Sequence, residues 1–238
     1  MPQQLRAPAW RYPEYILRAL QNAGFEERDY QKVAVSGVVS LLQRGKAAEV
    51  DLPPGTGKTL VGHIVAWMWV HDLGSARNRV LILVPSTILL EQHSRVFQQW
   101  VPYSQCPSIE WSSEWLSSRR VWHAQQAENA RVFFALPQAL AGSIRSGRMP
   151  QSVWSTIRLV IIDEYDAFSL GAIAAESLDP QQASIHLKLS LSSLVNSLQE
   201  TSRVYFRLSA TPIATTAPTG TPGILLHDKT ARKLRLHR

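Results

Sequence analysis

Residues 51–59 have the sequence D-L-P-P-G-T-G-K-T, and the apolar run 60–70 follows them directly. Glycine takes positive φ without steric cost, so the backbone amides of such a loop can point at an anion from the start of a helix. The match is to G-x-G-K-T, since Pro53 stands where the consensus has a glycine. The pattern predicts a phosphate-binding loop in which Lys58 contributes a positive charge and Thr59 ligates magnesium. The predicted nucleotide contacts are Pro54, Gly55, Thr56, Gly57, Lys58 and Thr59. The alternative is a glycine-rich turn that binds nothing.

Length and composition set broad limits. A chain of 238 residues is long enough for one large α/β domain, with or without extensions. The 25 basic residues exceed the 18 acidic ones, giving a net charge of +7 that favours a polyanionic partner such as nucleic acid. Cys106 is the single cysteine, so no internal disulfide can form. The run 60–70 is too short to span a bilayer, and no signal segment opens the chain. We therefore expect a soluble, cytoplasmic protein without membrane association.

Apolar periodicity predicts an alternation of helices and strands. Continuous aliphatic runs bounded by charge or proline indicate buried parallel strands at 79–84, 131–136, 157–162 and 204–208. Helical spacing predicts helices at 14–23, 33–42, 60–70, 88–100 and 185–198. Loops are expected at 142–152 and 171–180. The order predicts a three-layer α/β/α fold around a mostly parallel sheet.

Carboxylates follow the most apolar strand. The strand expected at 157–162 leads directly into Asp163, Glu164, Tyr165 and Asp166. The carboxyl ends of parallel strands are where such folds place their chemistry. A carboxylate at that place can reach the magnesium ion on Thr59, and its neighbour can polarise an attacking water. Asp163 and Glu164 are therefore predicted to serve these two roles, with a solvated turn as the alternative.

Two further features have competing interpretations. Gln31 stands at the head of a predicted helix, and its amide offers the donor and acceptor pair that matches the edge of adenine. Taken alone, Gln31 is better explained as a solvated residue at a helix start. Trp111, Trp115 and Trp122 recur at spacings of four and seven, which favours the core side of a helix over a base-stacking surface.

Together these motifs resemble a known family. They run in the order R-x-Y-Q, P-P-G-T-G-K-T, V-P-S-T-I-L-L-E-Q, A-L-P-Q-A-L, I-I-D-E-Y-D and L-S-A-T-P. In order and spacing the chain resembles the first RecA-like domain of superfamily 2 helicases, the DEAD/DEAH-like group. The lead-in to Gln31 and the stretch 89–92 are most similar to the branch of type III restriction subunits and DNA repair helicases. The resemblance covers residues 24–212, with an N-terminal arm and short helix at 1–23 and a linker and basic tail at 213–238.

The resemblance implies roles for individual residues. The implied cofactors are ATP and Mg²⁺, and the implied activity is ATP hydrolysis coupled to nucleic-acid binding or remodelling. Gln31 would read adenine and Arg28 would also bind the nucleotide, while Lys58, Asp163 and Glu164 would carry catalysis, with Thr59 and Asp163 on the metal. Ser209 and Thr211 would couple nucleotide state to nucleic-acid binding through Asp166. Nucleic-acid contacts would come from Ser86, Thr87 and Gln138.

The chain also departs from the family pattern. Leu136 stands where the family often has threonine, and Thr87-Ile88 replaces the Arg-Glu pair of the RNA-directed branch, which favours DNA over RNA. We expect these 238 residues to hold only the first RecA-like domain, so a further domain or partner subunit would have to supply the arginine fingers. A lone first domain should bind nucleotide weakly and hydrolyse it slowly.

Two alternatives remain at this stage. An AAA+ ATPase has similar loop and carboxylate motifs, but usually places them much closer together than Lys58 and Asp163. The other alternative is a non-catalytic module, a truncated or split helicase half that docks to a partner.

Overall fold

The computed structural model describes residues 10–46, 48–73, 78–111, 126–163, 204–209, 224–226 and 234–236. Its helices are α1 (Glu14–Asn22), α2 (Asp29–Gln43), α3 (Lys58–Met68), the π-helix η1 (Trp69–Leu73), α4 (Thr87–Trp100), α7 (Pro137–Arg145) and α8 (Gln151–Trp154). Its strands are β1 (Ala48–Asp51), β2 (Arg79–Leu83), β3 (Ser108–Trp111), β4 (Val132–Ala135), β5 (Ile157–Ile162), β6 (Val204–Ser209), β7 (Ile224–Leu226) and β8 (Leu234–Leu236). In the part of the chain that the structure describes, no helix is long and apolar enough to cross a membrane.

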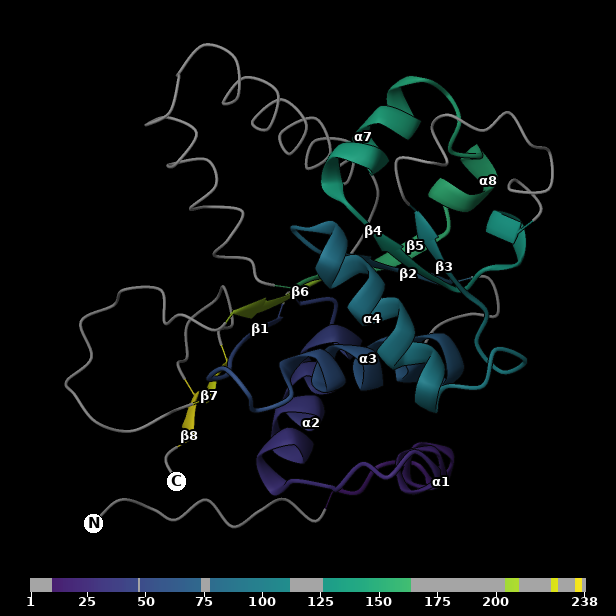
Figure 1. The fold of residues 1–238 in the computed structure, drawn as a ribbon. Coiled ribbons are helices and arrows are strands. Elements are labelled where there is room, and N and C mark those ends of the chain that lie inside the picture. The colour runs from purple at the N-terminus through teal and green to yellow at the C-terminus, as the bar shows by residue number, and fades with distance from the viewer. Residues whose placement is uncertain are drawn as a thin grey trace, which may run out of the picture.

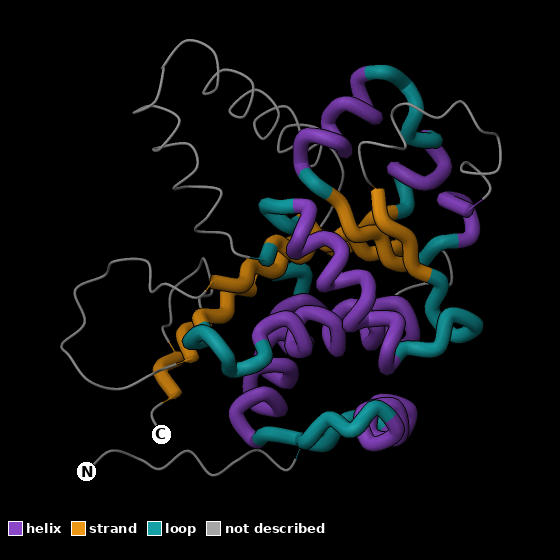
Figure 2. Tube along the Cα trace, in the orientation of Figure 1, coloured by secondary structure: helices purple, strands orange, loops and turns teal. Residues whose placement is uncertain are grey.

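One sheet connects all of these strands. Its order is β3-β4-β2-β5-β6-β1-β7-β8 (Figures 1 and 2). Neighbours from β3 to β1 pair in parallel, whereas β7 pairs antiparallel with both β1 and β8. Parallel neighbours need crossover connections, which the helices provide. The mostly parallel three-layer fold expected from the sequence is confirmed.

The two faces of the sheet bury different residues, because side chains alternate along a strand. On β2, Val80 and Ile82 pack with the helices α2, α3 and α4 in one apolar cluster. Leu81 and Leu83 belong to a second cluster with residues of α7 and α8. Figure 1 shows the same arrangement, with α2, α3 and α4 on one side of the sheet and α7 and α8 on the other.

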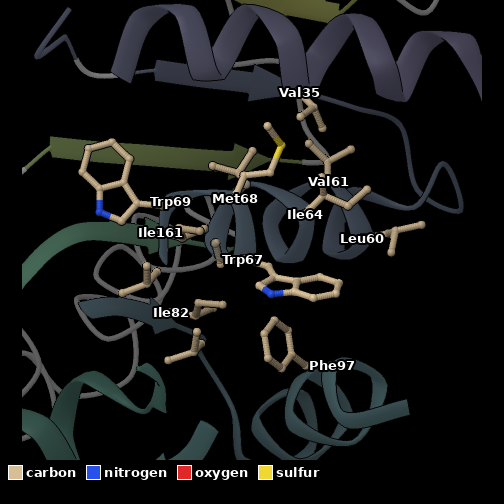
Figure 3. Packing of buried hydrophobic residues seen from close by; sticks show 14 of the residues in the cluster. Val35, Leu60, Val61, Ile64, Trp67, Met68, Trp69, Ile82, Phe97 and Ile161 are labelled. Atoms are coloured by element: carbon tan, nitrogen blue, oxygen red, sulfur yellow. The ribbon is translucent and has the colours of Figure 1, made fainter. Parts of the chain in front are cut away.

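Helix α3 is the centre of the larger cluster. All of its residues except Thr59 are buried, in agreement with the continuous apolar run that the sequence shows. Figure 3 shows Val61 and Ile64 of α3 next to Val35 of α2, and Trp67 facing Phe97 of α4. A helix buried all round is held in place by its neighbours on both sides. The loop that precedes α3 is therefore attached to a fixed element.

Three expectations from the sequence were wrong. Residues 142–152 were expected to form a loop, but α7 continues to Arg145 and α8 begins at Gln151. Trp111 was assigned to the core side of a helix, yet it lies on β3, where it is 2% exposed and donates from Nε1 to Ser143 Oγ at 2.6 Å. Its burial also rules out base stacking by this tryptophan.

The basic tail was the third error. Residues 213–238 were expected to form only a linker and tail, whereas β7 and β8 add two antiparallel strands to the sheet. The helix expected at 185–198, the loop at 171–180, and Trp115 and Trp122 lie outside the described residues.

Candidate nucleotide-binding site

Candidate residues gather at the carboxyl edge of the parallel strands. The loop 52–57 follows β1, and Asp163 follows β5. Only β6 lies between these two strands, which places them about 10 Å apart at the usual strand spacing. The backbone of Ser209, at the end of β6, pairs with Asp51 beside the loop. The fold thus brings together motifs that are far apart in the sequence.

The loop takes the backbone conformation that its glycines permit. Gly55 has φ 75° and Gly57 has φ 81°, both in the left-handed region. The Thr56 hydroxyl donates to the carbonyl of Pro53 at 2.6 Å, which closes a turn inside the loop. Gly57 is the N-cap of α3 and, as a glycine, has no side chain that could cap the helix. The first amides of α3 therefore have no side-chain cap at Gly57, which leaves this helix start open to an anion.

The first turn of α2 holds this loop. Gln31 donates from Nε2 to the carbonyl oxygen of Thr56 at 2.9 Å, and Tyr30 donates from its hydroxyl to the same oxygen at 2.8 Å. Arg28 donates from Nη1 to the Tyr30 hydroxyl at 2.9 Å. Gln31 is buried, at 4% exposure, so it is not the solvated helix-start residue that it could have been on sequence alone. Its amide keeps an acceptor oxygen and a second N–H besides the bond to the loop.

Lys58 and Thr59 begin α3 beside this loop. Lys58 is 8% exposed and Thr59 is half-buried. The Thr59 hydroxyl and the Asp163 carboxylate are both oxygen donors, the type that Mg²⁺ prefers. Among the described residues no group of three or more His, Cys, Asp or Glu side chains could hold a metal ion. The donor set fits an ion that is completed by phosphate oxygens and water, as Mg²⁺ commonly is.

Asp163 has a buried contact that the sequence did not predict. The residue is 2% exposed, and its Oδ2 lies 2.8 Å from Nε2 of His93 on α4. Nδ1 of His93 lies 3.2 Å from Nε2 of His63 on α3. Burial, and secondarily the nearby His93, holds the pKa of His63 well below its usual range. The only sequence signal for this pair was a histidine inside the apolar run 60–70.

The remaining predicted residues fall into two groups. Ser86 is the N-cap of α4 and accepts from the Leu89 amide at 3.3 Å, while Thr87 next to it is exposed. Leu136 is the N-cap of α7, and Gln138 is in its first turn. These residues follow β2 and β4, so they lie along the same edge as the loop. Glu164, Asp166 and Thr211 lie outside the described residues.

A comparison with protein families assigns the chain. The model of the DEAD/DEAH box helicase family matches residues 28–218. The chain belongs to this family. The match starts at Arg28, before the residues of α2 that hold the loop, and includes both the loop and Asp163. It also sets aside the AAA+ alternative. A search of curated proteins finds no match.

Solved helicase structures share the fold. The yeast DEAD-box splicing factor Prp28 superposes with a TM-score of 0.63 at 17% identity, over 84% of this chain and 44% of that one. A hypothetical ATP-dependent RNA helicase from Sulfolobus tokodaii has a TM-score of 0.55 at 23% identity, over 83% of this chain and 50% of that one. The Hef helicase domain of Pyrococcus furiosus has a TM-score of 0.53 at 20% identity, over 79% of this chain and 34% of that one. The chain thus spans half or less of the length of these proteins.

Proposed function

We propose that the chain is the ATP-binding half of a nucleic-acid-dependent superfamily 2 helicase or translocase. The observation that carries this proposal is the convergence of a loop with two positive-φ glycines, a lysine at a helix start and a buried carboxylate at one sheet edge. This arrangement can bind the phosphates of a nucleotide through backbone amides and Lys58. Family membership supports ATP as the nucleotide.

Each predicted residue has a place in this proposal. Gln31 and Arg28 lie beside the loop, where Gln31 can contact the adenine edge with its remaining acceptor and N–H. Thr59 and Asp163 hold Mg²⁺, which neutralises developing charge on the phosphates when bound. Glu164 polarises the attacking water, and Ser209, Asp166 and Thr211 couple nucleotide state to nucleic-acid binding.

The nucleic acid is proposed to be DNA, on the branch of type III restriction subunits and DNA repair helicases. Support comes from Thr87 and Ile88, which replace the Arg-Glu pair of the RNA-directed branch. Ile88 is 76% exposed, at the start of α4 and at the edge of the sheet that carries the site. Ser86, Thr87 and Gln138 would contact the strand. A second RecA-like domain, on a longer chain or a partner subunit, would supply the arginine fingers.

Replacing Lys58 tests the proposal. Lys58→Ala should weaken ATP binding more than tenfold, because a charge-assisted contact to phosphate is worth about 1.5–3 kcal/mol. Titration calorimetry with ATP and Mg²⁺ measures the affinity. Arg18→Ala is the matched control, since it removes an exposed positive charge from α1, and it should leave the affinity unchanged. Equal ATP affinity in Lys58→Ala and the wild type would refute a phosphate-binding role for the loop.

A further inference from the structure

The buried contacts that run from Asp163 to His93 and from His93 to His63 have no role in the site described so far. His63, His93 and Asp163 come from three elements, α3, α4 and the end of β5. Their exposed fractions are 0%, 2% and 2%. Phe97 and Phe134 pack edge-on against His63, with ring centroids 5.3 and 5.8 Å away. Two polar rings inside an apolar cluster are costly unless each finds a partner, so their placement requires an explanation.

The hydrogen-bond partners define where the protons lie. Nδ1 of His63 is buried and has no partner. A proton there would be a buried N–H without an acceptor, which is unfavourable, so the proton belongs on Nε2. Nε2 of His63 then donates to Nδ1 of His93, 3.2 Å away. The remaining proton of His93 is on Nε2, which faces Oδ2 of Asp163 at 2.8 Å. The distance is that of a charge-assisted contact, although the ring is not aligned for a straight hydrogen bond.

The backbone fixes the same aspartate from the other side. The Asp163 amide donates to the Leu83 carbonyl of β2 at 3.0 Å, which continues the sheet one residue beyond β5. The backbone of Asp163 is therefore held by β2, and its side chain is held by His93 of α4. Partners behind a metal ligand orient it and make it a better ligand, and their loss typically weakens metal affinity 10–100-fold.

We propose that His93 is a positioning residue for the magnesium-binding carboxylate of Asp163, and that His63 fixes the tautomer in which His93 does so. The inference rests on the proposed ATP and Mg²⁺ site. His93 holds Oδ2 in place, which sets the direction in which the carboxylate meets the ion. His63 lies on α3, the helix that begins with Lys58 and Thr59, so the pair also links the carboxylate to the phosphate-binding element.

The test measures how much Mg²⁺ strengthens nucleotide binding by the 238-residue chain. The affinity for a fluorescent ATP analogue is measured with Mg²⁺ and with EDTA, and the ratio of the two is compared among variants. His93→Leu should reduce this ratio about 10-fold or more and leave the affinity in EDTA unchanged. His93→Gln, whose amide N–H can replace Nε2–H, should recover part of the ratio.

Phe97→Leu is the matched control. Phe97 lies one turn further along α4 and packs against the same His63 ring, so its loss disturbs the cluster without removing the His93 contact. It should lower thermal stability and keep the wild-type ratio. A wild-type ratio in His93→Leu would overturn the positioning role alone. The absence of any Mg²⁺ effect in the wild type would overturn the proposed site, and the positioning role with it.

A second measurement needs no destabilising variant. Long-range ¹H–¹⁵N spectra of the wild type report which imidazole nitrogen carries the proton, and His93→Gln assigns the His93 signals. We expect His93 protonated at Nε2, with a shift on adding nucleotide and Mg²⁺ that exceeds the shift of the half-exposed His71. A His93 protonated only at Nδ1, or a shift no larger than that of His71, would contradict the proposal.

Discussion

The carbonyl oxygen of Thr56 is the point at which α2 and the phosphate-binding loop meet. It accepts hydrogen bonds from Gln31 and Tyr30, two consecutive residues of α2. Gly57, the next residue along, has no side chain to obstruct this contact: a Cβ at Gly57 would lie 2.5 Å from Nε2 of Gln31. The glycine of the motif therefore has two functions, because it takes positive φ and leaves room for the glutamine.

Replacing this glycine should separate the two effects. Gly57→Ala adds left-handed strain, worth about 1–2 kcal/mol of stability, and displaces Gln31 from the loop. Gly55→Ala is the matched control: φ is also positive there, but nothing lies within 4 Å of the added Cβ. Both variants should lose stability in denaturant unfolding, and Gly57→Ala should lose more, because it also breaks the hydrogen bond from Gln31 to Thr56. Nucleotide affinity should fall more in Gly57→Ala, and Gln31→Ala in that background should relieve the collision. Equal affinities in the two glycine variants would show that the contact with Gln31 has no part in binding.

At the scale of elements, α4 connects the proposed nucleic-acid contacts with the proposed metal ligand at the same edge of the sheet. Its N-terminus carries Ser86 and Thr87, proposed to contact nucleic acid, and His93 lies in its second turn behind Asp163. The helix spans 14 residues and buries Leu90, His93, Ser94, Phe97 and Trp100 against the sheet and α3. A change at the start of α4 can therefore reach the carboxylate through a rigid element.

Ser86 should contribute to stability as well as to binding. Its hydroxyl caps α4, and replacing such a cap by alanine costs about 1 kcal/mol. Ser86→Ala should therefore lower the unfolding free energy by about that amount, whereas Ser86→Asn should keep it, since asparagine is an equally good cap. Thr87→Ala, one residue on, removes an exposed hydroxyl that is not the cap, and should leave stability within about 0.5 kcal/mol. Denaturant unfolding of the three variants measures these free energies. An unfolding free energy of Ser86→Ala equal to that of the wild type would exclude a stabilising cap.

The elements also show where sequence reasoning succeeds. The strands at 79–83 and 157–162 were predictable because a parallel strand covered on both faces needs a continuous apolar run. Helix α7 was missed because Gly142 and Ser143 suggested a loop. In the structure Ser143 donates to the Ala139 carbonyl and accepts from Trp111, a tertiary contact that stabilises the helical turn. Strands β7 and β8 were missed as well, because each has three residues, and a segment of that length is too short to show a periodic pattern.

The site was predictable only where its chemistry is local. The residues 55–59 form a contiguous motif, and a carboxylate after a buried strand is a local pattern too. His93 and Asp163 are far apart in sequence and meet because β2 and β5 are neighbours in the sheet. Tyr30 contacts the loop for the same kind of reason, through the packing of α2 on the sheet. Contacts of this type depend on the fold, and a single sequence has no pattern that encodes them.

For the whole molecule, the C-terminal strands change how the basic tail should be tested. β7 pairs with β1, the strand that leads into the phosphate-binding loop. Removing the tail would expose the edge of β1, since an unpaired strand edge is left with unsatisfied backbone groups. A deletion would therefore disturb the nucleotide site together with any nucleic-acid contact. Charge removal outside the strands is the cleaner experiment.

Nucleic-acid binding should be weak and dominated by charge, because this chain spans half or less of the helicases it resembles in fold. Single-stranded DNA should bind with about micromolar or poorer affinity at physiological salt, since phosphate neutralisation provides most non-specific binding. The test variant has glutamine in place of Lys229, Arg232, Lys233 and Arg238. A plot of log affinity against log salt concentration should become less steep in this variant. Its slope should fall in magnitude by up to about 3, because each lost phosphate contact removes about 0.7.

The control removes the same charge elsewhere. Glutamine at Arg11, Arg18, Arg44 and Arg148, four exposed arginines, lowers the net charge equally and should change the salt slope much less. Fluorescence anisotropy over a salt series measures both variants, and ATP affinity should equal that of the wild type in each. If the salt dependence of binding becomes equally less steep in both variants, the attraction comes from the net charge of +7 and not from the tail. Tight binding that resists salt and survives the tail substitutions would instead require a specific groove on this single domain, formed where Ser86, Thr87 and Gln138 follow the strands.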